Sequence, residues 1–195
     1  MRTSELDVVV VGTGGQGVIL ISEIIGRAAL KAGLPVRGAE THGMAQRGGS
    51  VVDYIRVGCR FSAMVSPGGA DVLLALEPAE ALRYAHYLSP KGVALVNTRP
   101  LHPITVTTGL ATYPELEEIL DPLRGVCKKV RTMDATALAA EAGHPQAANV
   151  VMLGALSKYL PIEEETVMEA IVETVPPRFL DVNKHAFELG KTEVE

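Results

Sequence analysis

The sequence is poor in the residues that build redox and metal centres. It has no tryptophan and only two cysteines, Cys59 and Cys127, far apart in the chain. An iron–sulfur cluster is usually held by four thiolates, so this chain alone cannot supply one. Its five histidines are scattered rather than set at the spacing of a zinc site, so we expect no metal bound by this chain. Both cysteines are expected to be reduced and unpaired.

Basic charge and long apolar runs are lacking as well. The formal net charge is -5 at pH 7, whereas a nucleic-acid-binding protein needs a basic face to neutralise phosphates, so no nucleic-acid partner is expected. The longest strongly apolar stretch, Ala147–Leu156, is interrupted by Asn149 and is far too short for a membrane span. The first residues are too polar for a secretory signal. We therefore expect a cytoplasmic protein with no membrane partner.

The N-terminal third has the pattern of an α/β protein. Asp7–Val11 is a continuous run rich in valine, which predicts a strand buried on both faces, as in a parallel sheet. A glycine-rich turn follows, and then Val18–Lys31 predicts a helix that Gly33 closes. Hydrophobic residues make up 47% of 195 residues, enough for one well-packed core. Because no linker or repeat interrupts the pattern, residues 1–195 are predicted to form a single domain.

The remaining elements predict a three-layer, Rossmann-like α/β fold, with a mixed sheet, helices on both faces and a helix-rich C-terminal third. Strands are predicted at Leu34–Ala39, Ser50–Val57, Arg60–Val65, Asp71–Leu76, Val93–Asn97 and Gly125–Thr132. Gly58 and Cys59 are interpreted as a hairpin turn, and Ile104–Thr107 can form a short strand within an irregular segment. Helices are predicted from Glu77 to about Tyr87, at Pro114–Leu123, Ala135–Ala142, Gln146–Tyr159 and Glu163–Val175, and from about Arg178 to Gly190.

The glycine-rich turn, Gly12-Thr13-Gly14-Gly15-Gln16-Gly17, fits the pattern Gly-x-Gly-x-x-Gly. Glycines in such a turn let a phosphate approach backbone N–H groups at a helix N-terminus. The same glycines can instead serve only close packing of strand and helix. A dinucleotide site also needs an acidic residue about 20 residues further on. Glu40 is the one candidate, and it falls slightly late, in a predicted loop, so a stand-alone nucleotide- or flavin-binding protein stays open as an alternative.

A second unusual segment is His42-Gly43-Met44-Ala45-Gln46-Arg47-Gly48-Gly49-Ser50, within a predicted exposed loop from Glu40 to Ser50. Ordering so many glycines costs conformational entropy, which a bound group would offset. Arg47 is suited to pair with a carboxylate or phosphate, and His42 to carry a proton or donate a hydrogen bond. The alternative is a solvated turn with a surface arginine.

Polar residues next to buried elements are weaker candidates. Glu77 and Glu80 follow a predicted buried strand, at the edge where open α/β sheets bind ligands. The preferred interpretation is a capped, solvated helix start with Glu80 beside Arg83. Asn149 lies inside an apolar helix, and we expect it to satisfy a backbone group of a neighbouring loop rather than reach a ligand.

Taken together, the glycine-rich turn and the His42–Ser50 segment resemble the gamma-type domain of the 2-oxoacid:ferredoxin oxidoreductases. Later stretches agree with the resemblance, namely Leu76–Arg83, Val96–Thr98, Tyr113-Pro114, Asn149–Ala155 and Asn183–Gly190. Members that act on pyruvate or 2-oxoglutarate tend to carry a tyrosine-and-glutamate version of the second segment, which this chain lacks. The resemblance therefore implies oxidative decarboxylation of an aryl 2-oxoacid, such as indolepyruvate, to an acyl-CoA, with electrons passed to ferredoxin.

The resemblance also implies how the work is divided between subunits. Thiamine diphosphate, Mg and the [4Fe-4S] clusters belong to a larger alpha subunit, CoA is a co-substrate, and this chain alone binds no cofactor. The glycine-rich turn and Arg47 would hold the CoA diphosphate or face the thiamine pocket, and His42 and Gln46 would line the wall that faces the partner. The implied cofactor-binding residues are Gly12, Thr13, Gly14, Gly15, Gln16, Gly17, Gln46, Gly48 and Gly49, with His42 and Arg47 as supporting residues of the cleft.

The resemblance names the alpha subunit as the direct partner and ferredoxin as a partner of the whole complex. An unpartnered subunit of this kind should expose apolar surface, so we expect self-association, as a homodimer, when the chain is isolated. A non-catalytic scaffold for the alpha subunit is a further alternative.

Overall fold

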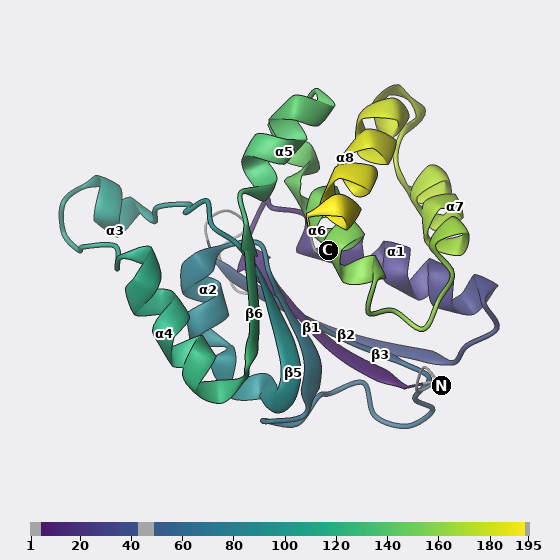
Figure 1. Cartoon of the computed structure of the whole chain (residues 1–195), viewed down its shortest axis with the longest axis horizontal. Coiled ribbons are helices and arrows are strands. Elements are labelled where there is room, and N and C mark those ends of the chain that lie inside the picture. The colour runs from purple at the N-terminus through teal and green to yellow at the C-terminus, as the bar shows by residue number, and fades with distance from the viewer. Residues whose placement is uncertain (1–4, 43–48, 194–195) are drawn as a thin grey trace.

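A mixed sheet forms the middle layer of the computed structural model, which describes residues 5–42 and 49–193 (Figure 1). The six strands lie in the order β2-β3-β1-β4-β5-β6. β1, β4, β5 and β6 run parallel, whereas β3 is antiparallel to both of its neighbours, β1 and β2. The strands are β1 (Leu6–Thr13), β2 (Val36–His42), β3 (Ser50–Val57), β4 (Ala70–Ala75), β5 (Leu88–Asn97) and β6 (Lys129–Met133).

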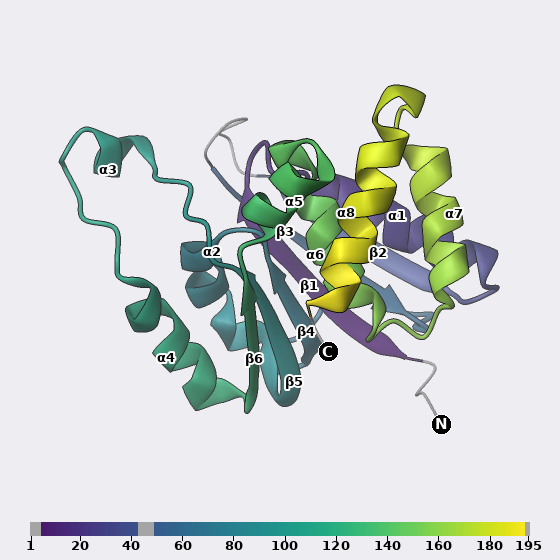
Figure 2. The ribbon, with the colours of Figure 1, turned by 45° about the horizontal axis from the view of Figure 1, so that its top comes forward.

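Helices cover both faces of this sheet, which confirms the predicted three-layer α/β fold (Figures 1 and 2). One face carries α1 (Val18–Lys31), α5 (Ala135–Ala142), α6 (Ala148–Ser157), α7 (Glu164–Thr174) and α8 (Leu180–Thr192). The other face carries α2 (Pro78–Arg83) and α4 (Leu116–Val126), whereas α3 (Ile104–Thr107) stands away from both layers. Short 3-10 turns occur at Ala85–Tyr87, Pro145–Ala147 and Pro177–Phe179.

The valine run of β1 lies at the centre of the core. Val8 and Val10 point to the face covered by α1, and Val9 and Val11 point to the face covered by α2, and all four are fully buried. Successive side chains of a strand alternate between faces, so an unbroken apolar run is stable only between two layers of helices.

Helix α1 begins and ends where the sequence predicts. Gly33 has a φ of 71°, a left-handed conformation that favours glycine, and its N–H donates to the carbonyl of Leu30 at 3.0 Å. The N–H of Leu34 then donates to the carbonyl of Ala29 at 2.9 Å, which closes the helix C-terminus.

Helices α6 and α8 pack with their backbones in contact. A Cβ atom on Gly154 of α6 would overlap the carbonyl of Phe187, and one on Gly190 of α8 would overlap the carbonyl of Val151. Larger residues at either position would force the helices apart. All residues of α6 from Asn149 to Ser157 are buried, as its apolar sequence predicts.

Several predicted elements or boundaries are wrong because tertiary contacts override the local pattern. The strand predicted at Gly125–Thr132 begins only at Lys129, because Gly125 and Val126 belong to α4. Arg60–Val65 forms no strand, because β3 already pairs with β1 on one edge and with β2 on the other. Ile104–Thr107 is the short helix α3 rather than a strand, because it lies away from any sheet edge. β2 continues through Glu40 to His42, because these residues pair with Asp53–Val51 of β3.

Candidate functional site

The glycine-rich turn lies at the carboxyl end of β1 and is held by its own glutamine. The Oε1 atom of Gln16 accepts hydrogen bonds from the backbone N of Thr13 at 2.8 Å and from its Oγ1 at 3.1 Å. The Nε2 atom of Gln16 donates to the carbonyl of Leu76 at 3.0 Å, just after β4. Gln16 therefore fixes the turn and ties β1 to its parallel neighbour.

Three glycines of this turn differ in their surroundings, because two are tightly packed and one faces open space. A Cβ on Gly12 would lie 3.0 Å from Val18 Cγ2 and 3.2 Å from Leu76 Cβ, and one on Gly17 would overlap the Asn149 amide. Gly15 has a φ of 101°, and a Cβ there would meet nothing within 4 Å. Gly12 and Gly17 thus serve close packing, whereas Gly15 faces open space that a ligand can enter.

A cavity of about 500 Å³ opens beside this turn, and we call it the glycine-turn cavity. It lies at the carboxyl ends of the parallel strands, where open α/β sheets bind ligands. None of the side chains that line it within the described residues is charged, and an anion there would be stabilised by the N-terminal end of α1 and its dipole. The lining residues are Gly14, Gly15, Gln16, Gly17, Leu76, Asn97, Leu101, Thr136, Pro145, Gln146, Ala148 and Asn149.

Asn97 is a wall residue of this cavity that the sequence reasoning missed as a site residue. It is buried, its Nδ2 donates to the carbonyl of Leu76 at 3.1 Å, and its Oδ1 accepts from the N–H of Ala135 at 3.1 Å. These bonds join β4, β5 and the start of α5. The signal was present, because a polar residue at the end of a buried strand falls on the ligand-binding edge of an α/β sheet.

Asn149 serves mainly the backbone, as predicted. Its Nδ2 lies 3.5 Å from the carbonyl of Gly17, and its Oδ1 accepts from the N–H of Val150 at 2.9 Å. It also lines the glycine-turn cavity.

The two glycine-rich segments of the sequence meet at one edge of the sheet. The N–H of Gly14 donates to the carbonyl of Gly49 at 2.8 Å, and Thr13 of β1 pairs with Ser50 of β3. His42 ends β2 two strands from β1, about 10 Å away at the usual strand spacing. Gln46, Arg47 and Gly48 lie outside the described residues, as does the side chain of His42, so their predicted roles stay predictions.

Glu80 anchors the start of β3. Its Oε2 accepts a hydrogen bond from Ser50 Oγ at 2.5 Å, and its Oε1 lies 3.1 Å from Arg83 Nε, as the sequence predicts. The helix start is capped, because Glu77 Oε2 accepts from the N–H of Glu80 at 3.0 Å. The predicted solvation is wrong, because Glu77 and Glu80 are both buried.

Glu77 also holds a loop at the mouth of the cavity. Its Oε1 accepts from the N–H of Leu101 at 3.3 Å and from the hydroxyl of Tyr113. Burial, followed by the hydrogen bond to Glu77, raises the pKa of Tyr113 above its usual value. The phenol therefore stays protonated and donates to the carboxylate.

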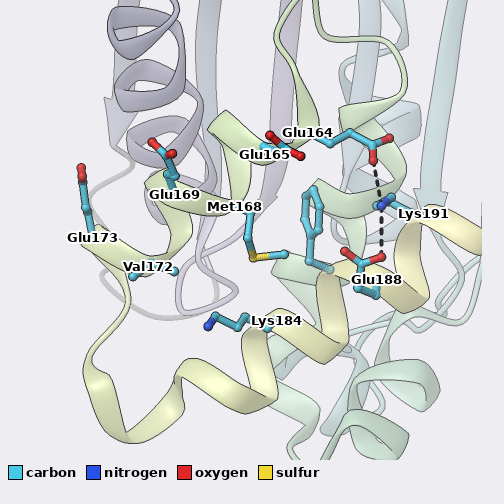
Figure 3. Close-up of a pocket in the computed structure, with 10 residues that line it drawn as sticks. Glu164, Glu165, Met168, Glu169, Val172, Glu173, Lys184, Glu188 and Lys191 are labelled. Atoms are coloured by element: carbon cyan, nitrogen blue, oxygen red, sulfur yellow. Dashed lines mark hydrogen bonds and ion pairs between the residues drawn. The ribbon is translucent and has the colours of Figure 1, made fainter.

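A larger cavity, of about 720 Å³, lies between α7 and α8, and we call it the α7–α8 cavity (Figure 3). Four of its five glutamates form ion pairs with lysines. Lys191 Nζ lies 2.7 Å from Glu164 Oε2 and 3.0 Å from Glu188 Oε2, as the dashed lines show. Lys31 of α1 lies 2.8 Å from Glu173 and 3.2 Å from Glu169. This cavity is remote from the glycine-rich turn.

The position of Glu40 does not match the acidic residue of a dinucleotide site. That residue usually ends the strand adjacent and parallel to the first. Here the antiparallel β3 separates β2 from β1, and Glu40 pairs with Asp53 of β3.

Metal and membrane features are not evident in the described part of the chain. Cys59 is partly exposed, Cys127 is buried, and both are free thiols. No three His, Cys, Asp or Glu side chains of residues 5–42 and 49–193 gather as metal ligands. Every helix within those ranges falls short of the length and apolar content of a membrane span.

Fold and site together define a Rossmann-like α/β protein with a cavity at the carboxyl ends of its parallel strands. The family described as pyruvate ferredoxin/flavodoxin oxidoreductase matches residues 7–193, and the chain belongs to this family. A curated relative, the indolepyruvate oxidoreductase subunit IorB of Archaeoglobus fulgidus, is 49% identical over 95% of this chain and 93% of its own length.

Solved structures of the same fold include two ferredoxin oxidoreductases. The gamma subunit of a keto/oxoacid ferredoxin oxidoreductase from Geobacter sulfurreducens aligns with a TM-score of 0.69 and 24% identity, over 97% of this chain and 98% of that chain. A 2-oxoglutarate:ferredoxin oxidoreductase from Magnetococcus marinus, with 2-oxoglutarate, coenzyme A and succinyl-CoA bound, aligns with a TM-score of 0.74 and 23% identity. The alignment covers 98% of this chain but 31% of that one, so the same fold is there part of a longer chain.

Proposed function

We propose that this chain is a non-autonomous, single-domain subunit of a cytoplasmic, thiamine-dependent 2-oxoacid:ferredoxin oxidoreductase that acts on arylpyruvates such as indolepyruvate. The observation that carries the proposal is the near-full-length similarity to an indolepyruvate oxidoreductase subunit. The resemblance of the His42–Ser50 segment, which lacks the tyrosine-and-glutamate version, supports the choice of an aryl substrate.

The cofactors of this reaction are proposed to lie in an alpha-type partner subunit. Two free cysteines cannot hold a [4Fe-4S] cluster, and the described residues gather no set of metal ligands. Thiamine diphosphate with Mg supplies, when bound in the partner, the carbanion stabilisation that decarboxylation of a 2-oxoacid requires. Electrons then go to ferredoxin, and the acyl group goes to CoA.

The contribution of this chain is proposed to be a preorganised wall of the active-site cleft. The side-chain amides of Gln16 and Asn97 hydrogen-bond to backbone groups, so the wall holds its shape without a ligand. The open side of Gly15 lets the CoA diphosphate approach the start of α1, where the helix dipole favours negative charge. Arg47, whose segment leaves β2 and returns to β3 at this edge, would add the cationic partner that the cavity lacks.

This proposal is tested with the complex of this chain and the alpha-type subunit. Arg47→Ala should raise the KM for CoA by about tenfold or more, because a charge-assisted pair with a diphosphate is lost. Arg60→Ala is the matched control, because Arg60 is exposed at the amino edge of the parallel strands, opposite the glycine-rich turn. Its kinetics should equal those of the wild type.

Unchanged steady-state kinetics for CoA and indolepyruvate in Arg47→Ala would refute the role of Arg47 and leave the scaffold interpretation. Tight binding of NAD or FAD by the isolated chain, in a calorimetric titration, would instead favour a stand-alone nucleotide- or flavin-binding protein.

A further inference from the structure

A loop next to the glycine-turn cavity is uncharged and carries exposed aliphatic side chains. Residues 100–114, which we call the α3 arm, contain no Asp, Glu, Lys or Arg, although charged residues make up 21% of the chain. Ile104 is 76% exposed and Leu110 is 82% exposed. Figures 1 and 2 show α3 standing clear of both helical layers. Two large aliphatic side chains that are this exposed on one uncharged turn make it a candidate interaction site.

The tip of the α3 arm is folded by its own hydrogen bonds. The N–H of Thr108 donates to the carbonyl of Ile104 at 2.9 Å, and the N–H of Leu110 donates to the carbonyl of Thr105 at 2.8 Å. The hydroxyl of Thr108 adds a bond to the carbonyl of Ile104 at 2.8 Å. A preorganised tip loses little conformational entropy when it binds, so its exposed side chains suit a rigid docking element.

The base of the arm is fixed to the mouth of the cavity. Glu77 accepts hydrogen bonds from both limbs, from the N–H of Leu101 and from the hydroxyl of Tyr113. The rings of His102 and Tyr113 lie 5.0 Å apart across the two limbs. Leu101 also lines the glycine-turn cavity. A protein that binds the tip is thereby brought to the edge of the candidate site.

Two described recesses are acidic and are poor seats for the apolar tip of a second copy of this chain, whereas a smaller, uncharged recess of about 170 Å³ beside Val175 and Phe179 is the seat that the self-association measurement below tests. The α7–α8 cavity is rimmed by glutamates, among them Glu165 and Glu169 (Figure 3). A recess of about 540 Å³ between α1 and β2 carries Glu23, Glu40 and Asp53. Burying an apolar tip against such carboxylates would remove water from them at a cost. The uncharged glycine-turn cavity is the proposed ligand site, so it must stay open.

We infer that the α3 arm docks its apolar tip, Ile104 and Leu110, into an uncharged apolar recess of the cofactor-bearing partner subunit. This inference rests on the proposed function, since that function supplies the partner. It adds the surface by which the two chains are aligned: the arm holds the partner across the mouth of the glycine-turn cavity.

The double variant Ile104→Asp/Leu110→Asp tests the inference in the co-expressed complex. Both side chains are exposed, so the melting temperature of the isolated chain should be unchanged. The dissociation constant for the alpha-type subunit should rise at least about tenfold, as for a central apolar anchor. Phe61→Asp is the matched control, because Phe61 is 89% exposed and follows the end of β3 that lies at the amino ends of the parallel strands. This variant should bind like the wild type.

Amide hydrogen exchange gives a second measurement. The amides of residues 104–111 should exchange more slowly in the wild-type complex than in the isolated chain. Binding by the double variant within twofold of the wild type, or unchanged exchange of the arm, would overturn the inference while the activity of the wild-type complex upholds the proposed function. Loss of self-association by the double variant, with partner binding intact, would assign the arm to a second copy instead. A wild-type chain that neither binds nor activates the alpha-type subunit would refute both.

Discussion

The α7–α8 cavity and the glycine-turn cavity differ in how they handle charge. In the first, Lys191 contacts Glu164 and Glu188, and the neighbouring Lys31 contacts Glu169 and Glu173, so most of its glutamates are paired with lysines of the same chain. In the second, the described walls are neutral, and the buried amide of Asn97 hydrogen-bonds to the backbone of neighbouring elements. The larger cavity therefore has an acidic surface with internal ion pairs, whereas the described walls of the smaller one are uncharged and fixed by hydrogen bonds to the backbone.

The strongest test of this comparison is Gly17→Ala at the rigid cavity. The φ of 82° is strained for alanine, and its Cβ would overlap the Asn149 amide. We expect the free energy of unfolding to fall by about 2–3 kcal/mol, which lowers the melting temperature by roughly 4–12 °C in a chain of this size. Calorimetry or thermal circular dichroism measures both quantities.

Gly26→Ala is the matched control for Gly17→Ala. It lies within α1, the helix that Gly17 precedes, it has no positive φ, and a Cβ there meets nothing within 4 Å. Alanine should be neutral or raise stability by about 0.5–1 kcal/mol, because glycine is a poor helix former. Equal stability of the two variants would mean that the turn is not as tightly built as described.

An intermediate effect is expected for Tyr113→Phe at the base of the α3 arm. The variant loses the hydrogen bond to Glu77, and the N–H of Ala79 loses its acceptor, which lies at 3.1 Å. We expect a loss of about 1–2 kcal/mol of unfolding free energy at neutral pH.

The pH dependence of this loss has a defined sign. Burial and the Glu77 bond raise the pKa of Tyr113 in the folded state, so the folded chain holds this proton more tightly than the unfolded chain. The stabilisation is complete below the unfolded pKa of about 10 and declines as the pH rises beyond it. Urea unfolding of both proteins across this range should show their difference shrinking only above pH 10, and a constant difference would contradict the assignment.

The smallest effect is expected for Lys191→Met at the α7–α8 cavity. Glu164 and Glu188 keep 47% and 54% of their side-chain surface in water, so they stay hydrated without the lysine. The unfolding free energy should change by less than about 1 kcal/mol, and the change should shrink further at high salt. A loss as large as that of Gly17→Ala would show that this cavity, too, depends on a fixed geometry.

The sequence predicted the fold well wherever a signal was local or strongly periodic. The boundaries of α1 and the buried strand at β1 follow from glycines and a valine run, and both are as predicted. The prediction of a hairpin strand at Arg60–Val65 was wrong, because no sequence pattern reveals that β3 already pairs with a strand on each side. The prediction of a strand at α3 was wrong because β-branched residues favour a strand only where a neighbouring strand is available for pairing.

The candidate site was predictable in part. The glycine-rich turn and the flanks of the His42–Ser50 segment meet, as the resemblance implied. To predict Asn97 as a site residue, one must know which strand ends line the same cavity. Glu77 accepts hydrogen bonds from both Leu101 and Tyr113, residues up to 36 positions away, and a sequence pattern does not encode such contacts.

The insertion of β3 between β1 and β2 has a consequence for the order of folding. β1, α1 and the β2–β3 hairpin can form from neighbouring residues, but β2 joins the sheet only through β3. The bond from Gly14 to Gly49 therefore forms when the hairpin docks, a non-local step of the kind that slows folding. The glycine-rich turn is synthesised early, but its contact with the start of β3 forms only when the hairpin has docked.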